Sequence, residues 1–583
     1  MNSPRGASAA SSRRRAVVVV PVVVVLALLL ATAWLAHRAL QVRDALTSAS
    51  AQLPGLQAAV LDGDAATARE ALPDLQARTA RARTASSDPL WRAAGVLPAV
   101  GDDLRAVSAV SAAVDDVAVD VLPRLLGASE ALDPAALAGE GGRLQLGPLQ
   151  AAAPALAEAD DAARNARDAV TAVPVEGLLP QLSGPVGRVR DGLDDLVATT
   201  GAASRIAALV PPMAGADGRR TYMLLVQNNA ELRATGGIPG AWAVVTADDG
   251  ALELEQVGSA FEPADEPVLP LDPADLALHG DRMGRYLQST TSTPRFPVAA
   301  GLAREMLRRS TGTEVDGVLS VDPVALSYVL AGTGPVALPT GDELSAATAV
   351  PLLLSDVYAR YEDPAAQDDF FADAAGAVFE GLAAGEGDRR VVLAGLLRAG
   401  REGRLLAWSA DEREQALLSG AAVGGDLPAE GGPDVGVFLD DGTEGKVGYY
   451  LRAAVSVRRA CADAGSVEVE TVLSSSAPAL GLPRYVTGTR VPEGERGTAV
   501  TNVMVYGPAD GGIATVALDG EDVPFTSVDD RGRPVALVRV AVPPGGSATV
   551  TAGVAGLPRT GAPSLRVTPM AQPADVTSTA SCA

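Results

Sequence analysis

The stretch Tyr222–Val245, YMLLVQNNAELRATGGIPGAWAVV, decides how the rest of the chain is interpreted. Tyr222–Val226 is an apolar run typical of a buried strand, and Ala241–Val245 is a second one. Polar side chains and paired glycines lie between them, and glycine favours turns because it tolerates positive φ. The pattern therefore predicts a strand, a tight polar loop that carries Arg233, and a second strand.

The loop has two interpretations, and the sequence leaves both open. In the structural one, amide and carboxylate side chains satisfy backbone groups while Arg233 pairs with Glu231 or with a buried carboxylate. In the functional one, the loop binds a ligand and Arg233 contacts an anion. The candidate ligand-binding residues are then Asn228, Asn229, Glu231, Arg233, Thr235, Gly236 and Gly237.

Four segments together resemble a family of bacterial membrane-anchored proteins known as domain of unknown function 4012. The loop sequence QNNAELRATGG resembles its signature. The resemblance continues, in order along the chain, through PLWRAAGVLPAVG (Pro89–Gly101), VDGVLSVDPVALSYVLAGTGPV (Val315–Val336) and GKVGYYL (Gly445–Leu451). This family brings no established activity, so the resemblance implies neither a reaction nor a cofactor.

Composition limits the classes of function. The chain has 583 residues, enough for several domains, and 48% of them are hydrophobic, which can fill a sizeable core. A formal charge of −24 argues against nucleic acid as a partner, because nucleic-acid binding normally needs a basic face.

The N-terminus predicts a membrane anchor. Residues 16–36 are uncharged and mostly Val, Leu and Ala, which is long enough to span a bilayer as a helix. Residues 1–15 form a basic tail with Arg13, Arg14 and Arg15, so the positive-inside rule places this tail in the cytoplasm and the bulk of the chain outside. A cleaved signal peptide is the alternative, since Ala31–Ala33 resembles a small-residue cleavage site.

Patterning after the anchor predicts a multidomain α+β protein. Apolar residues at helical spacing and Pro/Gly breaks predict an extracytoplasmic helical bundle over 40–212. Mixed helix and strand signals predict a central α/β domain over 219–425, in which Asp322 and Pro323 start a helix. Period-two alternation predicts a β-sandwich over 434–558, and 559–583 reads as a C-terminal tail.

The sequence gives no support for the standard catalytic motifs. The chain has two histidines, and nothing near His279 supports a Ser-His-Asp triad. No Cys/His cluster offers a zinc site, so we expect no metal, no cofactor and no assigned catalytic residue. The two cysteines, Cys461 and Cys582, both fall on the predicted outer side, and we expect them to form a disulfide rather than remain two free thiols.

The order of elements in the central region is also similar to that of the LytR-CpsA-Psr family. Those enzymes transfer glycopolymers from a polyprenyl pyrophosphate carrier onto the cell wall, with arginines on the pyrophosphate and acidic residues on magnesium. Arg233 stands roughly where the first such arginine falls. However, residues 260–263, Ala-Phe-Glu-Pro, replace the family's Pro-Arg-Asp, so one anion contact and one metal contact are missing. A function inferred from this similarity therefore rests on analogy between folds alone.

Two functions therefore remain. The first is a membrane-anchored, extracytoplasmic envelope protein, not an enzyme, that binds a glycopolymer, a lipid carrier or a protein partner. The second is a divergent phosphoglycosyl-type transferase acting on a polyprenyl-linked glycopolymer. The two differ in one observation, namely whether acidic and basic side chains converge in an apolar cleft deep enough for a lipid.

Overall fold

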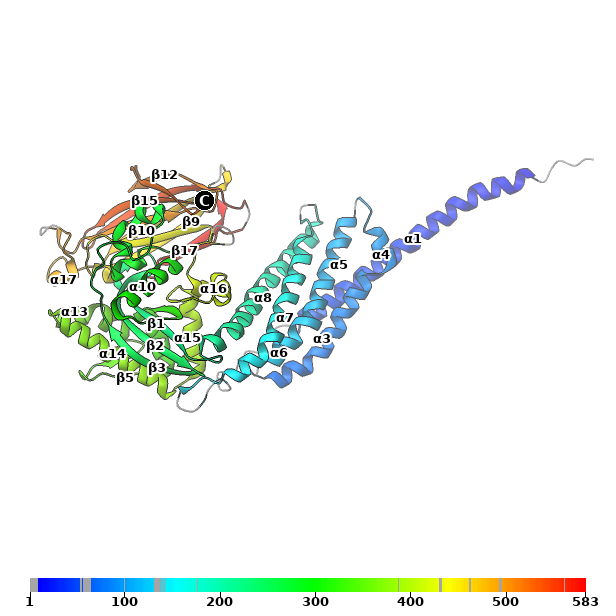
Figure 1. The fold of residues 1–583 in the computed structure, drawn as a ribbon. Coiled ribbons are helices and arrows are strands. Elements are labelled where there is room, and N and C mark those ends of the chain that lie inside the picture. Colours follow the sequence, from blue (N-terminus) through cyan, green and yellow to red (C-terminus); the bar gives the residue numbers. More distant parts are fainter. Residues whose placement is uncertain are drawn as a thin grey trace, which may run out of the picture. The chain divides into compact units, whose positions relative to one another are not determined.

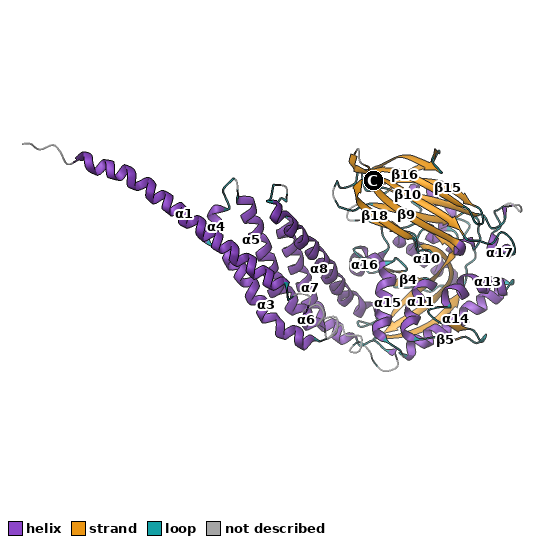
Figure 2. Ribbon diagram, turned by 180° about the vertical axis from the view of Figure 1, so that it is seen from behind, coloured by secondary structure: helices purple, strands orange, loops and turns teal. Residues whose placement is uncertain are grey.

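The computed structural model describes residues 9–582, apart from 53–54, 56–63, 99, 130–136, 138, 140–141, 176, 386, 429–431, 461–462, 492–494 and 560. Helix makes up 49% and strand 25%, which confirms a multidomain α+β protein. The chain divides into two compact units, each described here by itself (Figures 1 and 2). The helical unit is Met1–Leu137 with Gly147–Val210, and the central unit is Ala138–Leu146 with Pro211–Ala583.

The helical unit is built from long Ala-rich helices. Alanine and leucine are strong helix formers, and small side chains let neighbouring helices approach closely. Apolar faces of α5, α7 and α8 meet in one cluster that includes Ala106, Ala166 and Leu193. The helices are α1 (Ala9–Ser50), α3 (Ala65–Ser86), α4 (Pro89–Ala94), α5 (Gly101–Asp116), the π-helical turn η1 (Val117–Val121), α6 (Leu122–Ser129), α7 (Leu146–Thr171) and α8 (Pro180–Met213).

Helix α1 contains the apolar N-terminal segment. Among the described residues, Val22–Ser50 is the one stretch of helix long and apolar enough to cross a membrane, with a mean hydropathy of 2.0 and no buried residue in its most apolar 18-residue window. These properties agree with a membrane anchor and equally with a signal sequence.

The central unit contains a five-stranded sheet in the order β3-β2-β1-β4-β7. Strand β1 pairs antiparallel with β2 and parallel with β4, so it occupies the middle of the sheet. Because both of its faces are covered, the first half of β1, Tyr222–Val226, reads as a continuous apolar run. The strands are β1 (Arg220–Arg233), β2 (Gly236–Asp248), β3 (Ala251–Gly258), β4 (Gly317–Val321) and β7 (Leu405–Ser409).

Alternation along β1 directs side chains to two different helical layers. Met223 and Leu225 face α10 and pack with Phe296 and Leu302. Leu224 and Val226 point to the opposite face, toward α11 and α14. The helices are α9 (Pro273–His279), α10 (Phe296–Thr311), α11 (Pro323–Thr333), α12 (Ala349–Pro351), α13 (Val357–Arg360), α14 (Pro364–Ala384), α15 (Arg389–Arg401), α16 (Glu412–Ser419) and α17 (Arg484–Thr487), with short turns η3 (Asp281–Gly284), η4 (Leu287–Ser292), η5 (Leu352–Asp356), η6 (Ala422–Gly424) and η7 (Val447–Tyr450).

Two further sheets enclose a core of valine and leucine, and we call them the C-terminal sheet pair. One has the order β13-β12-β16-β10-β9-β18 and the other β14-β15-β11-β8-β17. The strands are β8 (Val435–Asp441), β9 (Leu451–Ala460), β10 (Asp463–Ser475), β11 (Ala499–Tyr506), β12 (Gly512–Leu518), β13 (Glu521–Asp522), β14 (Thr526–Asp530), β15 (Arg533–Val542), β16 (Ser547–Ala555), β17 (Leu565–Val567) and β18 (Asp575–Cys582). A separate two-stranded ribbon joins β5 (Val336–Ala337) to β6 (Glu343–Leu344).

Three sequence predictions can be compared directly with these elements. Asp322 caps α11 and Pro323 follows it, as predicted. The expected tail, 559–583, instead supplies β17 and β18, which extend the two sheets by parallel pairing with β8 and β9. The predicted disulfide between Cys461 and Cys582 is not supported, and Cys461 lies outside the described residues.

Candidate functional site

The predicted loop from Asn228 to Gly237 is wrong, because those residues belong to a β-hairpin. Strand β1 runs to Arg233 and β2 starts at Gly236. The register shifts between Asn228 and Leu232, so the three residues between them bulge out of the ladder. Gly236 has φ +136°, and a Cβ atom on Gly237 would stand 2.1 Å from the Asn228 carbonyl oxygen. The paired glycines therefore close the hairpin itself.

Polar side chains of the hairpin are buried and satisfied by specific partners, which is why a polar stretch can occupy a strand. The Gln227 Oε1 accepts a hydrogen bond from the Gly237 N–H at 2.8 Å, and its Nε2 donates to Ser320 on β4 at 2.7 Å. The Thr235 N–H donates to the Thr291 carbonyl at 3.3 Å. Gly236, Gly237 and Thr235 thus face protein groups.

The two asparagines connect β1 to different parts of the unit. The Asn228 Oδ1 accepts from the Ala230 N–H at 3.0 Å, and its Nδ2 donates to the Tyr358 hydroxyl. The Asn229 Nδ2 donates to Asp322 and to the Pro569 carbonyl, both at 3.0 Å. Asn228 therefore reaches the helical side of the sheet, whereas Asn229 reaches the start of α11 and the segment after β17.

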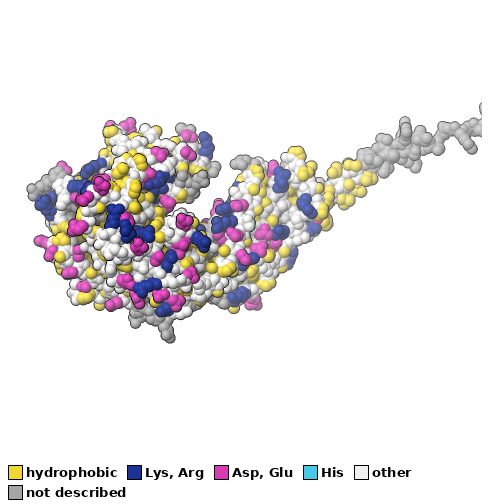
Figure 3. Space-filling model, viewed as in Figure 1, with side chains coloured by type: hydrophobic (Ala, Val, Ile, Leu, Met, Phe, Trp, Pro, Cys, Tyr) yellow, Lys and Arg dark blue, Asp and Glu magenta, His cyan; other side chains and the backbone are white. Residues whose placement is uncertain are grey.

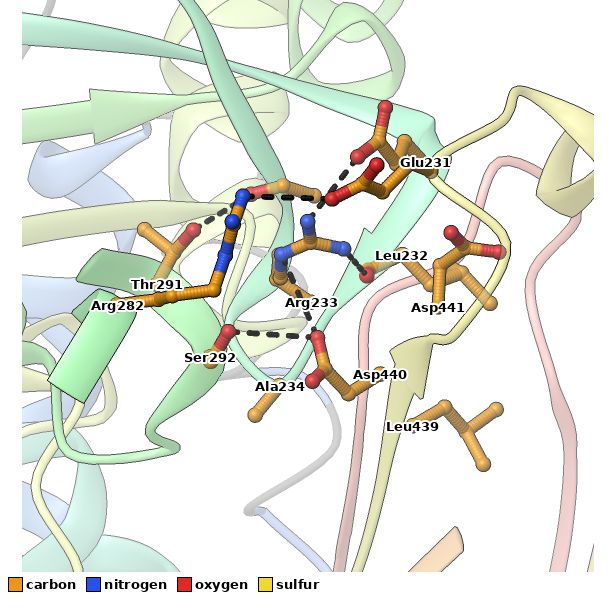
Figure 4. Close-up of polar contacts among 12 residues, drawn as sticks. Glu231, Leu232, Arg233, Ala234, Arg282, Thr291, Ser292, Leu439, Asp440 and Asp441 are labelled. Carbon is orange, nitrogen blue, oxygen red and sulfur yellow. Dashed lines mark hydrogen bonds and ion pairs between the residues drawn. The ribbon is translucent and has the colours of Figure 1, made fainter. Parts of the chain in front are cut away.

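The charged residues of the hairpin form a buried cluster with β8 and the segment after it (Figure 4). The Arg233 guanidinium lies between Glu231, at 3.0 Å, and Asp440, at 3.4 Å, and also donates to the Leu232 carbonyl at 2.8 Å. Lys446 contacts the other Glu231 oxygen at 2.7 Å. Of the two predicted partners for Arg233, the structure shows both: Glu231 and a carboxylate distant in sequence.

Burial and mutual contact shift the pKa values in this cluster. Burial opposes ionisation of Glu231, but Lys446 and Arg233 outweigh it and lower its pKa. Burial raises the pKa of Asp440 to about 7 against the opposing effect of Arg233, and burial with the nearby Glu231 raises that of Asp441 to about 6. Two cations thus face one firmly ionised carboxylate and two that titrate near neutrality.

A cavity of about 470 Å³ lies beside this cluster, between the central sheet and the helices on one of its faces. Its volume falls in the range of small-molecule sites. Most of the wall is apolar: β1 and β3 contribute Leu224, Val226 and Leu254, and the helices contribute Leu326, Phe371 and Val378. An apolar wall of this size favours an apolar ligand over water.

One part of the cavity wall is polar, and Lys446 joins it to the charge cluster. Lys446 lines the cavity and lies over the rings of Tyr358 and Tyr485 at 5.5 and 5.4 Å. Its ammonium has three N–H groups, whereas Glu231 accepts one bond. Burial raises the pKa of Tyr358 to about 12, so its hydroxyl keeps a proton, and that proton is free to donate because Asn228 donates to the oxygen. Spare donors therefore converge on an apolar cavity.

A second buried ion pair, between Arg404 and Asp322, lies at the wall of the cavity. The Arg404 guanidinium donates to Asp322 at 2.8 Å and to the Met570 carbonyl at 3.0 Å, and the side chains of Arg404 and Asp322 are each 3% exposed. The same Asp322 carboxylate accepts from Asn229 and caps α11 through the Ala325 N–H. Paired in this way, Asp322 lines the cavity without a free carboxylate.

Three of the four sequence motifs meet here. Residues of the hairpin contact Ser320 and Asp322 from the motif Val315–Val336 and Lys446 from the motif Gly445–Leu451, and a Cβ on Gly448 would stand 2.7 Å from the Ala230 carbonyl oxygen. Sequence reasoning missed Lys446 and Asp440 as members of the site. The position of Lys446 inside the motif Gly445–Leu451 was a signal that could have found it, whereas Asp440 lies outside the motif.

Comparison with known protein families gives a match over part of this site. Residues 217–358 match the model of a family described as a protein of unknown function, DUF4012. No curated protein matches the chain. The matched segment runs from β1 to Tyr358 and so contains both asparagines, Glu231, Arg233 and Asp322, whereas Lys446 lies beyond it. The match supports the family indicated by the motifs: the segment that builds the hairpin and much of the cavity wall is similar to DUF4012 proteins.

Proposed function

We propose that this chain is a membrane-anchored envelope protein whose central unit binds a lipid-linked ligand. Helix α1 holds the protein in the bilayer, with the basic tail in the cytoplasm and with the central unit and the rest of the helical unit outside. The apolar chain of the ligand occupies the cavity, and its polar head lies at Lys446, Tyr358 and Asn228. A polyisoprenyl phosphate or a related carrier has this chemistry.

The observation that carries the proposal is the junction of apolar wall and spare donors in one cavity. Filling an apolar cavity with hydrocarbon contributes about 0.8 kcal/mol for each buried CH₂ group. Charge-assisted donors then fix the orientation of a phosphate or sugar head. A protein partner would not need a cavity of this depth, so the lipid carrier is favoured among the three ligand classes expected from sequence.

The second candidate, a LytR-CpsA-Psr-like transferase, has weaker support. One observation favours the transferase: cationic and acidic groups converge beside the cavity. The residues do not fit the magnesium site of that family: Glu231 is engaged by Lys446, Asp440 by Arg233, and Asp441 by Thr443 at 2.7 Å. Within the described ranges, no group of three or more His, Cys, Asp or Glu side chains is placed to hold a metal ion. Binding without catalysis is therefore our first proposal.

The proposal can be tested by filling the cavity with a larger side chain. Ala375 lines the cavity, whereas Ala372 on the same helix faces solvent. Full-length Ala375→Trp should bind a polyisoprenyl phosphate of defined length much more weakly in detergent micelles, as measured by calorimetric titration. Ala372→Trp should bind like the unmodified protein, and both should keep its unfolding temperature. Equal binding by the two variants, or no binding by the unmodified protein, would overturn the proposed site.

A further inference from the structure

Hydrophobic side chains are exposed at one end of the helical unit, around the connection between α4 and α5. Val96 is 79% exposed and Leu97 52%, and Leu90 and Val100 are also exposed. Figure 3 shows hydrophobic side chains gathered over this end and on the adjacent length of α1. We call Leu90, Val96, Leu97 and Val100 the apolar tip. Exposed apolar groups that cluster in this way mark a contact surface.

Side-chain contacts locate the apolar tip along α1. Asp88, immediately before α4, accepts a hydrogen bond from the Trp34 indole at 3.2 Å and pairs with Arg38 at 3.1 Å. Those two residues stand where the uncharged run of α1 ends. A tryptophan and an arginine at that position are typical of a membrane–water interface.

The direction of the chain after Asp88 carries the tip further toward the apolar part of α1. Helix α3 runs antiparallel to α1: Ala49 clusters with Ala68 and Leu75, whereas Val42 clusters with Ala82 and Ala85. As residue numbers rise along α3, the contacted positions on α1 therefore fall toward its apolar run. Helix α4 then lies beside α1 where α1 leaves the other helices, in both views (Figures 1 and 2).

The tip is held in place by buried contacts, so its exposure is built into the fold. Trp91 is buried, and its indole N–H donates to the Leu104 carbonyl at 3.0 Å. The Asp88 carboxylate caps α4 through the Leu90 N–H at 2.9 Å. The Leu179 N–H donates to Asp103 at 2.9 Å, which brings another exposed leucine to the same end.

We infer that the apolar tip inserts into the outer leaflet of the membrane that α1 crosses, as a second point of attachment beside the anchor. We choose the lipid bilayer as the partner of this surface because the apolar tip is continuous with α1 beside Trp34 and Arg38, which mark the membrane–water interface. This inference rests on the membrane anchoring proposed above and is independent of the ligand cavity. The motif Pro89–Gly101 thereby gains a physical role: a buried Trp91 supports an apolar surface that contacts lipid.

The experiment measures lipid contact at three positions of the full-length protein in nanodiscs of phosphatidylcholine and phosphatidylglycerol. Cys461 and Cys582 are first replaced by serine, and Leu97→Cys, Val119→Cys and Leu28→Cys are labelled with an environment-sensitive fluorophore. Val119 is the matched control: it is 47% exposed, and it lies about 27 Å along the helix from Gly101 at 1.5 Å per residue. Leu28, in the apolar run, reports the anchor by itself.

We expect blue-shifted emission at Leu97 and Leu28, with loss of fluorescence when the lipids carry an acyl-chain nitroxide, and neither effect at Val119. Quenching at Leu28 with a Leu97 signal like that of Val119 would overturn the apolar tip while leaving the anchor intact. Absence of quenching at Leu28 would overturn the anchor. A blue shift at Leu97 without quenching would show that protein covers the tip, and would also overturn the inference.

Discussion

Replacing Arg233 by alanine tests whether the hairpin charge is structural. Its side chain is 9% exposed and contacts Glu231 at 3.0 Å and Asp440 at 3.4 Å. Its removal leaves Glu231 with Lys446 alone and leaves Asp440 with no cation. Stranding a buried carboxylate costs roughly 3–5 kcal/mol. We therefore expect Arg233→Ala to destabilise the central unit by about that amount at pH 8.

The destabilisation should shrink in acid. Burial raises the pKa of Asp440 to about 7, so near pH 5 this carboxyl is already protonated in the folded protein and needs no cation. A structural ion pair therefore predicts a smaller loss at pH 5 than at pH 8. A ligand contact predicts no such dependence.

The assay is scanning calorimetry of the full-length protein in detergent, in which we expect the two units to unfold in separate transitions. A loss of this size lowers the midpoint of the central unit by about 5 °C. Arg308→Ala is the matched control: Arg308 pairs with Glu305 at 2.8 Å, but its side chain is 49% exposed, so the change should leave the midpoint close to that of the unmodified protein. If Arg233→Ala unfolds like the control and instead abolishes lipid binding, Arg233 is a ligand contact and the structural reasoning is refuted.

Three further changes test neighbouring features. Burial raises the pKa of Asp440 from 3.8 to about 7, so the folded protein binds this proton more tightly than the unfolded chain, and stability falls as pH rises through that window. Asp440→Asn should therefore flatten this part of the curve of stability against pH. An unchanged slope would contradict the raised pKa. Arg404→Ala strands Asp322 and should cost roughly 3–5 kcal/mol by calorimetry, with a loss below 1 kcal/mol contradicting the buried pair. Gly237→Ala places Cβ 2.1 Å from a carbonyl oxygen and should disrupt the hairpin, seen as faster amide exchange of β1 and β2; unchanged exchange would show that the hairpin tolerates a side chain.

Local sequence patterns were enough to predict individual strands. The candidate site could not be predicted in this way, because it is formed by residues that lie far apart in the sequence. The apolar runs at Tyr222–Val226 and Ala241–Val245 are strands because each alternates between two covered faces. The hairpin between them could not be predicted as strand from its own residues. Its amides and charges are compatible with burial only because Ser320, Asp322 and Asp440 arrive from far along the chain.

The C-terminal residues show the same limit. Their Ser, Thr, Pro and Ala content is typical of a poorly ordered tail. Two parallel pairings, with β8 and β9, nevertheless place Leu565–Val567 and Asp575–Cys582 in sheets. Edge pairing uses backbone groups, so side-chain composition carries little signal for it. The cavity is likewise a property of packing between β1, α11 and α14, and no single stretch of sequence contains it.

The short segment Ala138–Leu146 belongs to the central unit although its neighbours on both sides belong to the helical unit. The Leu144 N–H donates to the Gly250 carbonyl at 2.9 Å, and Arg143 pairs with Asp249 at 3.1 Å, so the segment lies against the turn between β2 and β3. A protease cut near Pro211 would therefore yield two pieces that still share a folded surface and co-purify. Expression of the piece from Pro211 onward would leave the Gly250 carbonyl without this partner. Separating the units cleanly requires cuts on both sides of the segment, and a fragment library for this protein should be planned around three boundaries.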